Sequence, residues 1–300
     1  MNLPSQLRQL CLLLLFIGHM LAKSVNKDIV AILNDEEGQK EHLRSLGYLS
    51  REGRSDDDFR TAIEKYQKFF GLTVTGRVDP ETANMMSIPR CQVPDIKADG
   101  LKIGEFVFSG VSWASKRITW NLNQVTGPFE RKHLELVVNN ALREWQTPSE
   151  LTFHRVFINP VIQVDLVTSD STGEHGDGFP FSERTLAHAF FPDNNPLGGD
   201  VHVNMKKDFY TYLYNANDFD LYYVLVHEIG HSLGLEHSQV EDSVMYPSLP
   251  PGTTFQGLHY DDIAAIQYAY GSNSLFISHA DSHRISILVI FTSLLSTFLR

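Results

Sequence analysis

The chain has 300 residues, of which 42% are hydrophobic and 11% aromatic, which is enough for about two domains with packed cores. Its formal net charge is −11 at pH 7. This acidic balance argues against a nucleic-acid partner, since such a partner requires a basic face.

The first 22 residues predict a secretory signal peptide. Arg8 precedes a short apolar run, Leu10–Ile17, and the small residue Ala22 offers a cleavage point. The run is short for a membrane span, although an uncleaved anchor is the alternative. Cleavage would remove Cys11 and leave Cys91 as a single cysteine in an oxidising compartment, with no partner for an internal disulfide.

Residues 23–95 carry helical periodicity and predict a small domain of three helices. The first predicted helix spans Asp28–Leu46. Asp57 or Asp58 would cap the second helix. The third would begin at Asp79-Pro80-Glu81, with proline at its first position.

The segment Pro89–Asp95 follows, with Cys91 near its centre. A proline near each end favours an extended strip that can lie across a cleft. A thiolate is a strong zinc ligand, so this cysteine would fill the position that a catalytic water needs. The alternative is a buried cysteine that packs as a small hydrophobic side chain.

Residues 105–271 predict an α+β domain, in which helices pack on a mixed sheet. Alternating apolar residues predict the strands, and an amphipathic pattern predicts the first helix. In chain order, the predicted elements are a strand at Ile118–Asn123, a helix at Phe129–Gln146, strands at Leu151–Phe157 and Ile162–Thr168, and a last helix that Asp261-Asp262 caps and Gly271 ends.

A histidine cluster lies in a glycine- and proline-rich part of this domain: His175, His188 and His202, together with Asp177. Three imidazoles and one carboxylate make a closed tetrahedral donor set, which suits a structural zinc ion. The alternative is a group of unrelated surface histidines.

The most specific motif runs from His227 to His237. On a helix, His227 and His231 lie one turn apart and can bind one metal ion, with Glu228 beside them. Gly234 can adopt a positive φ, which ends the helix and brings His237 back as a third ligand. Three neutral imidazoles leave the fourth tetrahedral position open to water, as in a catalytic zinc site.

The pattern HExxHxxGxxH, followed by Ser243-Val244-Met245-Tyr246-Pro247, resembles the metzincin peptidases. The strip PRCQVPD around Cys91 is similar to the cysteine-switch segment PRCGVPD of the matrix metalloproteinases, and residues 62–94 resemble the end of their propeptide. The chain departs from that family at Gln92. This residue would weaken latency if the family's glycine needs a conformation unfavourable to a Cβ atom.

The resemblance implies a zymogen-type zinc endopeptidase. Its catalytic domain would have a twisted mixed five-stranded sheet with three helices, after a propeptide that resembles a peptidoglycan-binding helical domain. Glu228 would act as the general base, and Cys91 would be the fourth zinc ligand of the latent form. Arg90 and Asp95 would pair to shape the strip, and Met245 would lie beneath the zinc without binding it. The structural zinc ligands of the family correspond to His175, Asp177, His188 and His202.

The resemblance also implies one calcium site with hard oxygen ligands, formed by Asp165, Asp200 and the carbonyls of Pro196 and Gly198. A second calcium site of the family is expected to be absent, because lysines replace acidic ligands there. The residues at and around its positions are Ser182, Asn204, Lys206 and Lys207.

Substrates would be extended peptides or proteins, with those of the extracellular matrix expected, that pair with a sheet edge at Leu186–Phe191. Leu186, Ala187, Tyr223 and Tyr246 are the predicted substrate-binding residues, and bulky Tyr223 predicts a shallow pocket after the scissile bond. Protein inhibitors of metalloproteinases are further implied partners, and the enzyme is expected to be an extracellular monomer.

The tail 272–300 begins with small residues, continues with a partly polar spacer and ends in the apolar run Ile285–Leu299. This order predicts a GPI-anchor signal and a cell-surface location, with simple secretion or a poor membrane anchor as alternatives. The tail carries no repeat typical of a hemopexin-like domain.

Two other interpretations compete with the active zymogen. One is a catalytically inactive, zinc-stabilised binding module at the cell surface, against which the intact Glu228 and three histidines argue. The other is a metzincin of another family, against which the strip around Cys91 argues.

Overall fold

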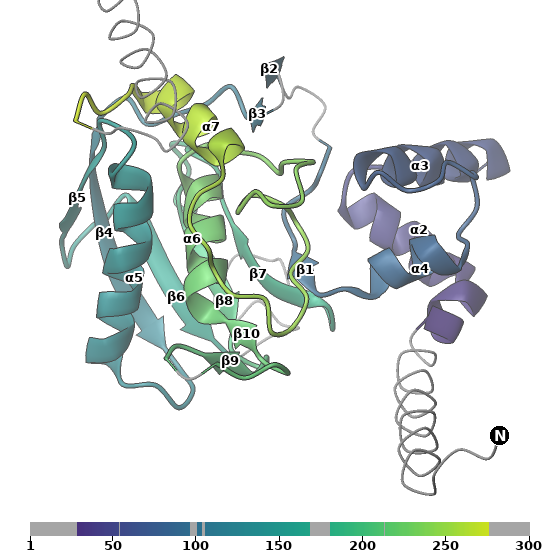
Figure 1. Cartoon of the computed structure of the whole chain (residues 1–300), viewed down its shortest axis with the longest axis horizontal. Helices are drawn as coiled ribbons and strands as arrows, with labels where there is room; N and C mark the ends of the chain where they lie inside the picture. Colours follow the sequence, from purple (N-terminus) through teal and green to yellow (C-terminus); the bar gives the residue numbers. More distant parts are fainter. Residues whose placement is uncertain are drawn as a thin grey trace, which may run out of the picture.

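The structure is a computed structural model that describes residues 29–53, 55–96, 101–103, 106–168, 181–212 and 214–275. The predicted signal peptide, the tail beyond residue 275, and the predicted ligands His175 and Asp177 lie outside these residues. Figure 1 shows a small helical unit beside a larger unit built of a sheet and helices. Each unit has its own hydrophobic core.

The small unit contains α2 (Glu36–Ser45), α3 (Asp56–Phe69) and α4 (Pro80–Ser87). The prediction of one helix over Asp28–Leu46 was wrong, because the helix is interrupted at Asp35 after a helical segment at 29–34. The Asp35 side chain accepts a hydrogen bond from the backbone N–H of Gly38 and caps α2. A short acidic side chain at this position competes with the continuing helix for backbone donors.

Ser55 caps α3, so the predicted cap at Asp57 or Asp58 was wrong. The Ser55 hydroxyl accepts from the backbone N–H of Asp58, and the Asp58 carboxylate accepts from the backbone N–H of Ser55. This reciprocal pair satisfies two donors that a helix start leaves open. Asp79 caps α4 and Pro80 occupies its first position, as predicted.

His42 on α2 lies against the ring of Tyr66, with centroids 5.9 Å apart, and its Nε2 is buried without a hydrogen-bond partner among the described residues. Burial, followed by the charges of Arg90 and Arg184, lowers the pKa of His42 from 6.5 to about 3. The folded unit therefore keeps this imidazole neutral.

Acid should consequently destabilise the small unit. An unfolded His42 binds its proton below pH 6.5, and the folded one binds it only near pH 3, so stability falls as the pH drops through this window. The free energy of unfolding should fall by at most about 1.4 kcal/mol per pH unit because of this group. We expect urea unfolding of the full chain between pH 6.5 and 4.5 to show this slope. His42→Phe should reduce this slope, whereas exposed His154→Phe should leave it unchanged.

A six-stranded sheet forms the larger unit, in the order β1-β7-β8-β6-β4-β5. All neighbouring strands are parallel except β7 and β8. Its strands are β1 (Arg90–Cys91), β4 (Arg117–Val125), β5 (Thr152–Arg155), β6 (Ile162–Val167), β7 (Thr185–Ala189) and β8 (Val201–Asn204).

Five of these strands agree with the predicted five-stranded sheet, and the sixth was not predicted. β1 comes from the strip around Cys91 and pairs with β7, with Arg90 opposite Thr185 and Cys91 opposite Ala187. The prediction that Leu186–Phe191 forms a sheet edge therefore needs correction for this form of the chain, because β1 covers β7.

Helices α5 (Arg131–Gln146) and α6 (Leu221–Ser232) lie on one face of the sheet (Figure 1). The Trp145 indole donates to the backbone carbonyl of Val226 at 2.9 Å and fixes one helix against the other. The last helix, α7 (Tyr260–Tyr270), is capped by His259, not by the predicted Asp261-Asp262. Asp262 instead closes a capping box by accepting from the backbone N–H of His259.

The remaining strands form two small sheets: β2 (Leu101–Ile103) with β3 (Phe106–Phe108), and β9 (Phe209–Tyr210) with β10 (Phe219–Asp220). Among the helices of the described ranges, none is both long enough and apolar enough to cross a membrane.

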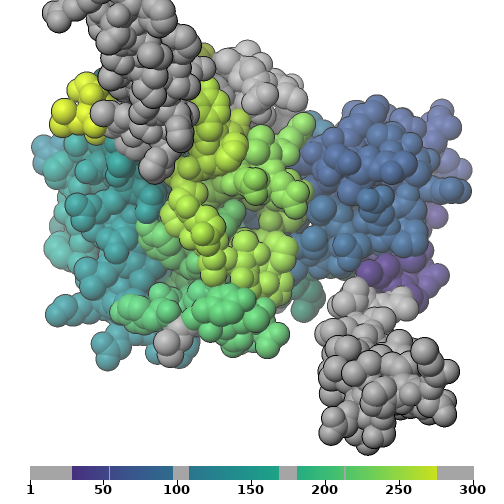
Figure 2. All heavy atoms as spheres, viewed as in Figure 1, coloured from purple at the N-terminus to yellow at the C-terminus, as the bar shows by residue number. Residues whose placement is uncertain are grey.

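The two units contact each other where β1 enters the sheet. The Tyr246 ring of the larger unit lies edge-on to the Phe70 ring of the small unit, with centroids 5.8 Å apart. The Arg90 guanidinium lies 5.9 Å from the centroid of the same Phe70 ring. Figure 2 shows the small unit, in purple and blue, packed against the green part of the larger unit.

Candidate metal centre and cleft

The zinc-binding motif lies on α6 and the turn after it. Asp220 caps α6 by accepting from the backbone N–H groups of Tyr222 and Tyr223. The helix ends at Ser232, and Gly234 has the predicted positive φ, at 99°. A Cβ on Gly234 would lie 2.2 Å from the Val111 carbonyl oxygen, so both the conformation and the close contact require glycine here.

Three buried imidazoles converge after this turn. His227 Nδ1 lies 2.6 Å from the Val244 carbonyl oxygen, and His231 Nδ1 lies 2.7 Å from that of Leu235. These carbonyls fix Nδ1 as the protonated nitrogen, which turns the basic Nε2 of both rings inward. The two Nε2 atoms are 3.1 Å apart. His237 joins them, with its ring centroid 4.6 Å from that of His231.

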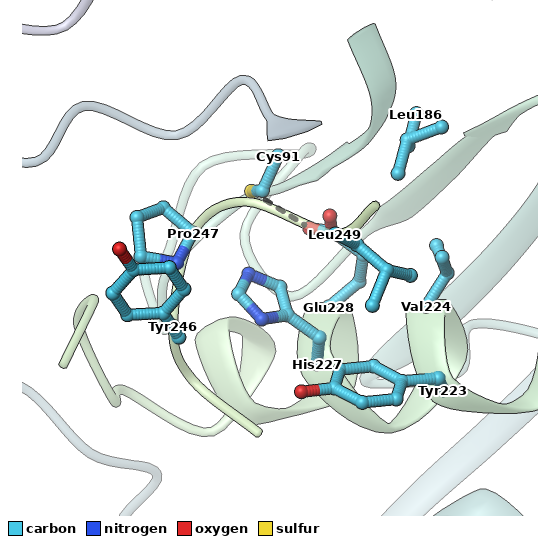
Figure 3. A pocket seen from close by; sticks show the side chains of 9 residues that line it. All are labelled: Cys91, Leu186, Tyr223, Val224, His227, Glu228, Tyr246, Pro247 and Leu249. Carbon is cyan, nitrogen blue, oxygen red and sulfur yellow. Dashed lines mark hydrogen bonds between the residues drawn. The ribbon is translucent and has the colours of Figure 1, made fainter. Parts of the chain in front are cut away.

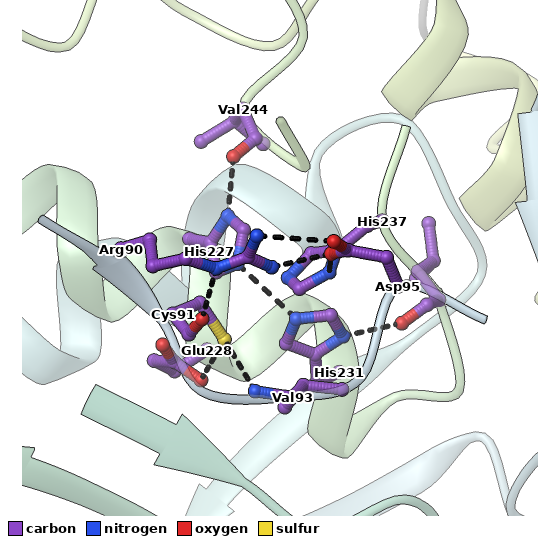
Figure 4. A network of polar contacts seen from close by, with 10 residues as sticks. Arg90, Cys91, Val93, Asp95, His227, Glu228, His231, His237 and Val244 are labelled. Carbon is purple, nitrogen blue, oxygen red and sulfur yellow. Dashed lines mark hydrogen bonds and ion pairs between the residues drawn. The ribbon is translucent and has the colours of Figure 1, made fainter. Parts of the chain in front are cut away.

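Cys91 completes the cluster. One ligand atom from each of Cys91, His227, His231 and His237 lies within 4.8 Å of all the others, and all four residues are buried. Figure 4 shows the sulfur pointing toward the imidazoles from the strip that crosses them. Soft sulfur and imidazole nitrogen are the donors that tetrahedral zinc prefers, so the set fits a zinc ion.

Backbone hydrogen bonds hold the strip on both sides. Cys91 N–H donates to the Pro247 carbonyl and Gln92 N–H donates to the Ala187 carbonyl, each at 3.0 Å. Gln92 adopts an ordinary negative φ, since Asn159 is the only non-glycine residue with a positive φ in the described ranges. The backbone at Gln92 therefore accommodates a Cβ atom, and the effect of Gln92 on latency stays untested.

A buried ion-pair network braces the strip. Arg90 and Asp95 form the expected two-pronged pair, with one guanidinium nitrogen 3.0 Å from the carboxylate, and the Asp95 side chain is fully buried. The same carboxylate lies 2.7 Å from His237 Nδ1, a contact that the sequence did not predict. Despite burial, Arg90 and His237 hold the pKa of Asp95 well below its usual range. Asp95 thus links the strip directly to the third imidazole.

Glu228 lies beside the cluster but outside the four donors. Its Oε2 is 3.5 Å from Cys91 Sγ (Figures 3 and 4). Burial raises the pKa of Glu228 to about 8. Burial, followed by the charge of Glu228, also raises the pKa of the Cys91 thiol. Burial also lowers the pKa of His227 to about 3, which keeps this ring neutral. A carboxyl group tuned toward neutral pH can both accept and donate a proton.

Met245 packs against Gly230 of the helix that carries the histidines. It is buried, and a Cβ on Gly230 would lie 2.4 Å from its sulfur. Gly230 therefore stays without a side chain because Met245 fills that space.

A cavity of about 20 Å³ opens beside Cys91. Of the four predicted substrate-binding residues, Leu186, Tyr223 and Tyr246 line it, whereas Ala187 lies opposite Cys91 in the sheet. Figure 3 shows the side chains around this space, including those of Val224 and Leu249, which the sequence analysis missed. The Cys91 strip itself lines this space, so the shallow pocket predicted from Tyr223 stays a prediction.

Two of the predicted structural-zinc ligands lie within the described residues. His188 Nε2 is 3.1 Å from His202 Nδ1, on adjacent strands β7 and β8. His202 Nε2 lies 3.9 Å from Asp165 Oδ2. The antiparallel register therefore brings these two imidazoles together, while the other two predicted ligands lie outside the described residues.

The predicted calcium ligands Asp165 and Asp200 are both buried. Burial, followed by the charge of Asp165, raises the pKa of Asp200 to about 7. Asp165 Oδ1 also accepts hydrogen bonds from Asn123 and from the backbone N–H of Gln124. Gly198 packs against the Asp193 backbone in the same loop as Pro196, and a Cβ on it would lie 2.3 Å from the Asp193 carbonyl oxygen.

The residues at the positions of the family's second calcium site connect β8 to the turn before β7 through hydrogen bonds. The Lys207 ammonium group donates to the Glu183 carbonyl. Asn204 donates to the Thr185 carbonyl at 2.9 Å, and the Ser182 hydroxyl lies 2.7 Å from that of Thr185. Lys206 contributes its backbone N–H, which donates to the Asn204 side chain.

A helix that carries HExxH and a glycine turn that returns a third histidine above a buried methionine define the metzincin class of metal-dependent peptidases. Residues 112–271 match the matrixin family, Peptidase_M10, and residues 39–86 match PG_binding_1, a peptidoglycan binding domain family. The chain belongs to the matrixin family.

Several curated proteins are similar over most of this chain. Matrilysin of Rattus norvegicus is 37% identical over 221 residues, which cover 71% of this chain and 76% of matrilysin. Matrix metalloproteinase-18 of Xenopus laevis is 36% identical over 251 residues, or 80% of this chain and 50% of that protein. Interstitial collagenase B of Mus musculus is 37% identical over 70% of this chain and 43% of its own length. The chain thus spans about half the length of several of these relatives.

Proposed function

We propose that the chain is a zinc-dependent endopeptidase made as a latent zymogen. The observation that carries this proposal is the buried cluster of Cys91, His227, His231 and His237 with Glu228 beside it. A binding module would need the histidines but would gain nothing from a buried carboxyl group held beside the metal donors.

The three imidazoles would hold the catalytic zinc, and Cys91 would be its fourth ligand until the strip is displaced. When bound, zinc supplies Lewis-acid activation of water and of the substrate carbonyl. Glu228 would take a proton from the attacking water at its carboxylate oxygen and deliver it to the leaving amine. The Val244 and Leu235 carbonyls keep His227 and His231 oriented throughout.

Removal of β1 would expose the backbone donors and acceptors of β7. An extended peptide could then replace it by backbone pairing, with the side chain after the scissile bond in the pocket of Leu186, Tyr223 and Tyr246. The name of one relative, interstitial collagenase, supports extracellular matrix proteins as the proposed substrates. Protein inhibitors that enter the same cleft are proposed as partners of the monomer.

Secretion and a GPI anchor complete the proposal, and both rest on the sequence patterns of residues 1–22 and 272–300. Mass spectrometry of the mature C-terminus tests the anchor, since a cleaved and lipid-modified end near Ser272–Ser274 is expected.

Peptide hydrolysis that depends on zinc tests the enzymatic proposal. Mature protein without the strip should cleave a quenched fluorescent peptide, lose this activity on dialysis against a zinc chelator and regain it on addition of zinc. A metal-replete, folded protein that cleaves no peptide in a diverse library would favour the inactive binding module instead.

We also propose a structural zinc at His188 and His202 with His175 and Asp177, and one calcium ion at Asp165 and Asp200 with the Pro196 and Gly198 carbonyls. Calcium should raise the melting temperature at pH 8, where it offsets repulsion between the two carboxylates, and much less at pH 5.5. The sign follows from Asp200, whose pKa of about 7 makes it mostly protonated in acid.

At a calcium concentration of 100 times Kd, the stabilisation should be about 2.7 kcal/mol. Asp200→Asn should remove the response in differential scanning calorimetry, whereas exposed Asp208→Asn should keep it. An equal calcium response in both variants would place the ion elsewhere.

A further inference from the structure

A groove of about 960 Å³ lies beside the metal centre, between residues 110–118 and residues 190–195. Apolar side chains form most of its walls, and Arg117 contributes a cation. None of these residues takes part in the zinc cluster or in the pocket beside Cys91.

Both walls of the groove are tied to the end of α6. On one wall, the Trp113 indole donates to the Ser232 carbonyl at 2.8 Å. On the other, the Phe191 ring lies 5.5 Å from the ring of the metal ligand His231. Each wall of the groove therefore contacts the end of the helix that carries the metal ligand His231.

The groove also continues the line of β7. Cys91 lies opposite Ala187, and Phe190 and Phe191 follow the end of β7 directly. At about 3.3 Å per residue, Phe191 lies about 13 Å further along the strand than Ala187. The cavity proposed for the side chain after the scissile bond is on the Leu186 side. Residues before the scissile bond would therefore run along β7 toward Phe191.

We infer that this groove binds the part of the substrate that begins about four residues before the scissile bond. The inference rests on the proposed peptidase function and deepens it, because it names a preferred substrate chemistry. A bound segment would place an apolar side chain against Trp113 and Phe191, and an acidic side chain near Arg117.

Charge supports the acidic preference. Arg117 is exposed at the start of β4, and its guanidinium group has no ion-pair partner among the described residues. The groove also contains the carboxylate of Asp193, but this group accepts hydrogen bonds from the Asn194 backbone at 2.6 Å and the Asn195 side chain at 2.7 Å. Arg117 is therefore the charged side chain of the groove that remains available to bind a ligand.

Two of the residues that line the groove, Trp113 and Val161, pack closely against Gly199. Gly199 has a φ of 87°, and a Cβ on it would lie 2.4 Å from the Val161 carbonyl oxygen and 2.9 Å from the Trp113 ring. The tryptophan therefore lies directly on this loop and presents a fixed apolar surface, which lowers the ordering cost of binding.

Three quenched peptides with the same six-residue core test the inference on mature protein. One is the core alone, and two carry six more upstream residues with either glutamate or lysine at the fifth position before the scissile bond. We expect kcat/KM about 10-fold higher for the glutamate peptide than for the core, mainly through KM. Arg117→Glu should reverse the preference to lysine and leave cleavage of the core unchanged.

Lys116→Glu is the matched control, since Lys116 is an exposed neighbour that does not line the groove. It should behave as the wild type. Equal kcat/KM for the three peptides, or an unchanged preference in Arg117→Glu, would overturn the inference. Fluorescence anisotropy of the labelled upstream segment alone measures groove binding without hydrolysis. Weaker binding to Arg117→Glu would support the groove even if the peptidase proposal failed, and equal binding would reject it.

Discussion

Glu228→Gln should lower kcat for peptide hydrolysis by about 100-fold to 10,000-fold, the range that general acid–base catalysis contributes. The amide keeps the shape of the side chain but cannot accept the proton from water. Zinc content should stay the same, because Glu228 is not one of the four clustered donors. Steady-state kinetics and metal analysis on the same samples make the measurement.

Glu241→Gln is the control for this substitution, because Glu241 is exposed and lies on the loop after the third histidine. It should retain wild-type kcat. If Glu228→Gln held its full zinc content and cleaved peptides at the wild-type rate, the proposed proton transfer would be wrong, although zinc-dependent hydrolysis would stand.

Asp95→Ala should activate the full-length, uncleaved chain. The substitution leaves the buried Arg90 guanidinium without its carboxylate and removes the partner of His237. Breaking a buried ion pair by removing one member costs about 3–5 kcal/mol. If this cost falls on the closed arrangement, the population with a displaced strip rises by about 100-fold or more. Peptide hydrolysis before any proteolysis, followed by electrophoresis to show an intact chain, is the measurement.

Cys91→Ser provides a reference for complete loss of the sulfur ligand, and the double variant Arg90→Met/Asp95→Leu is the control. The double variant removes both charges and replaces them with apolar side chains, which a buried site tolerates better than one unpaired charge. It should be less active before cleavage than Asp95→Ala. An inactive Asp95→Ala beside an active Cys91→Ser would show that the sulfur alone maintains latency.

The metal centre could be predicted from the sequence because its geometry is local. His227 and His231 are one helical turn apart, and Gly234 determines where the third histidine returns. The strand and helix positions of the larger unit were likewise visible as apolar periodicity. Cap positions were less predictable. Ser55 and His259 each cap a helix, but several acidic residues next to them could equally serve as the N-cap.

The contacts that the sequence did not predict join residues far apart in the chain. The contact of Asp95 with His237 spans 142 positions, and the pairing of β1 with β7 adds a sixth strand from outside the predicted catalytic domain. Neither leaves a periodic signal, because a two-residue strand is too short to show one. The groove beside Phe191 was not predicted either, because its two walls come from segments about 80 residues apart in the chain.

The direction of β1 has a consequence for self-digestion. β1 runs parallel to β7, from Thr185 toward Ala187, whereas the substrate proposed above, with its downstream side chain in the Leu186 pocket, would run the other way. The strip therefore presents its amide bonds in reverse polarity to the catalytic groups. A strip that lies in this reverse direction is not positioned for cleavage by the catalytic groups that it covers.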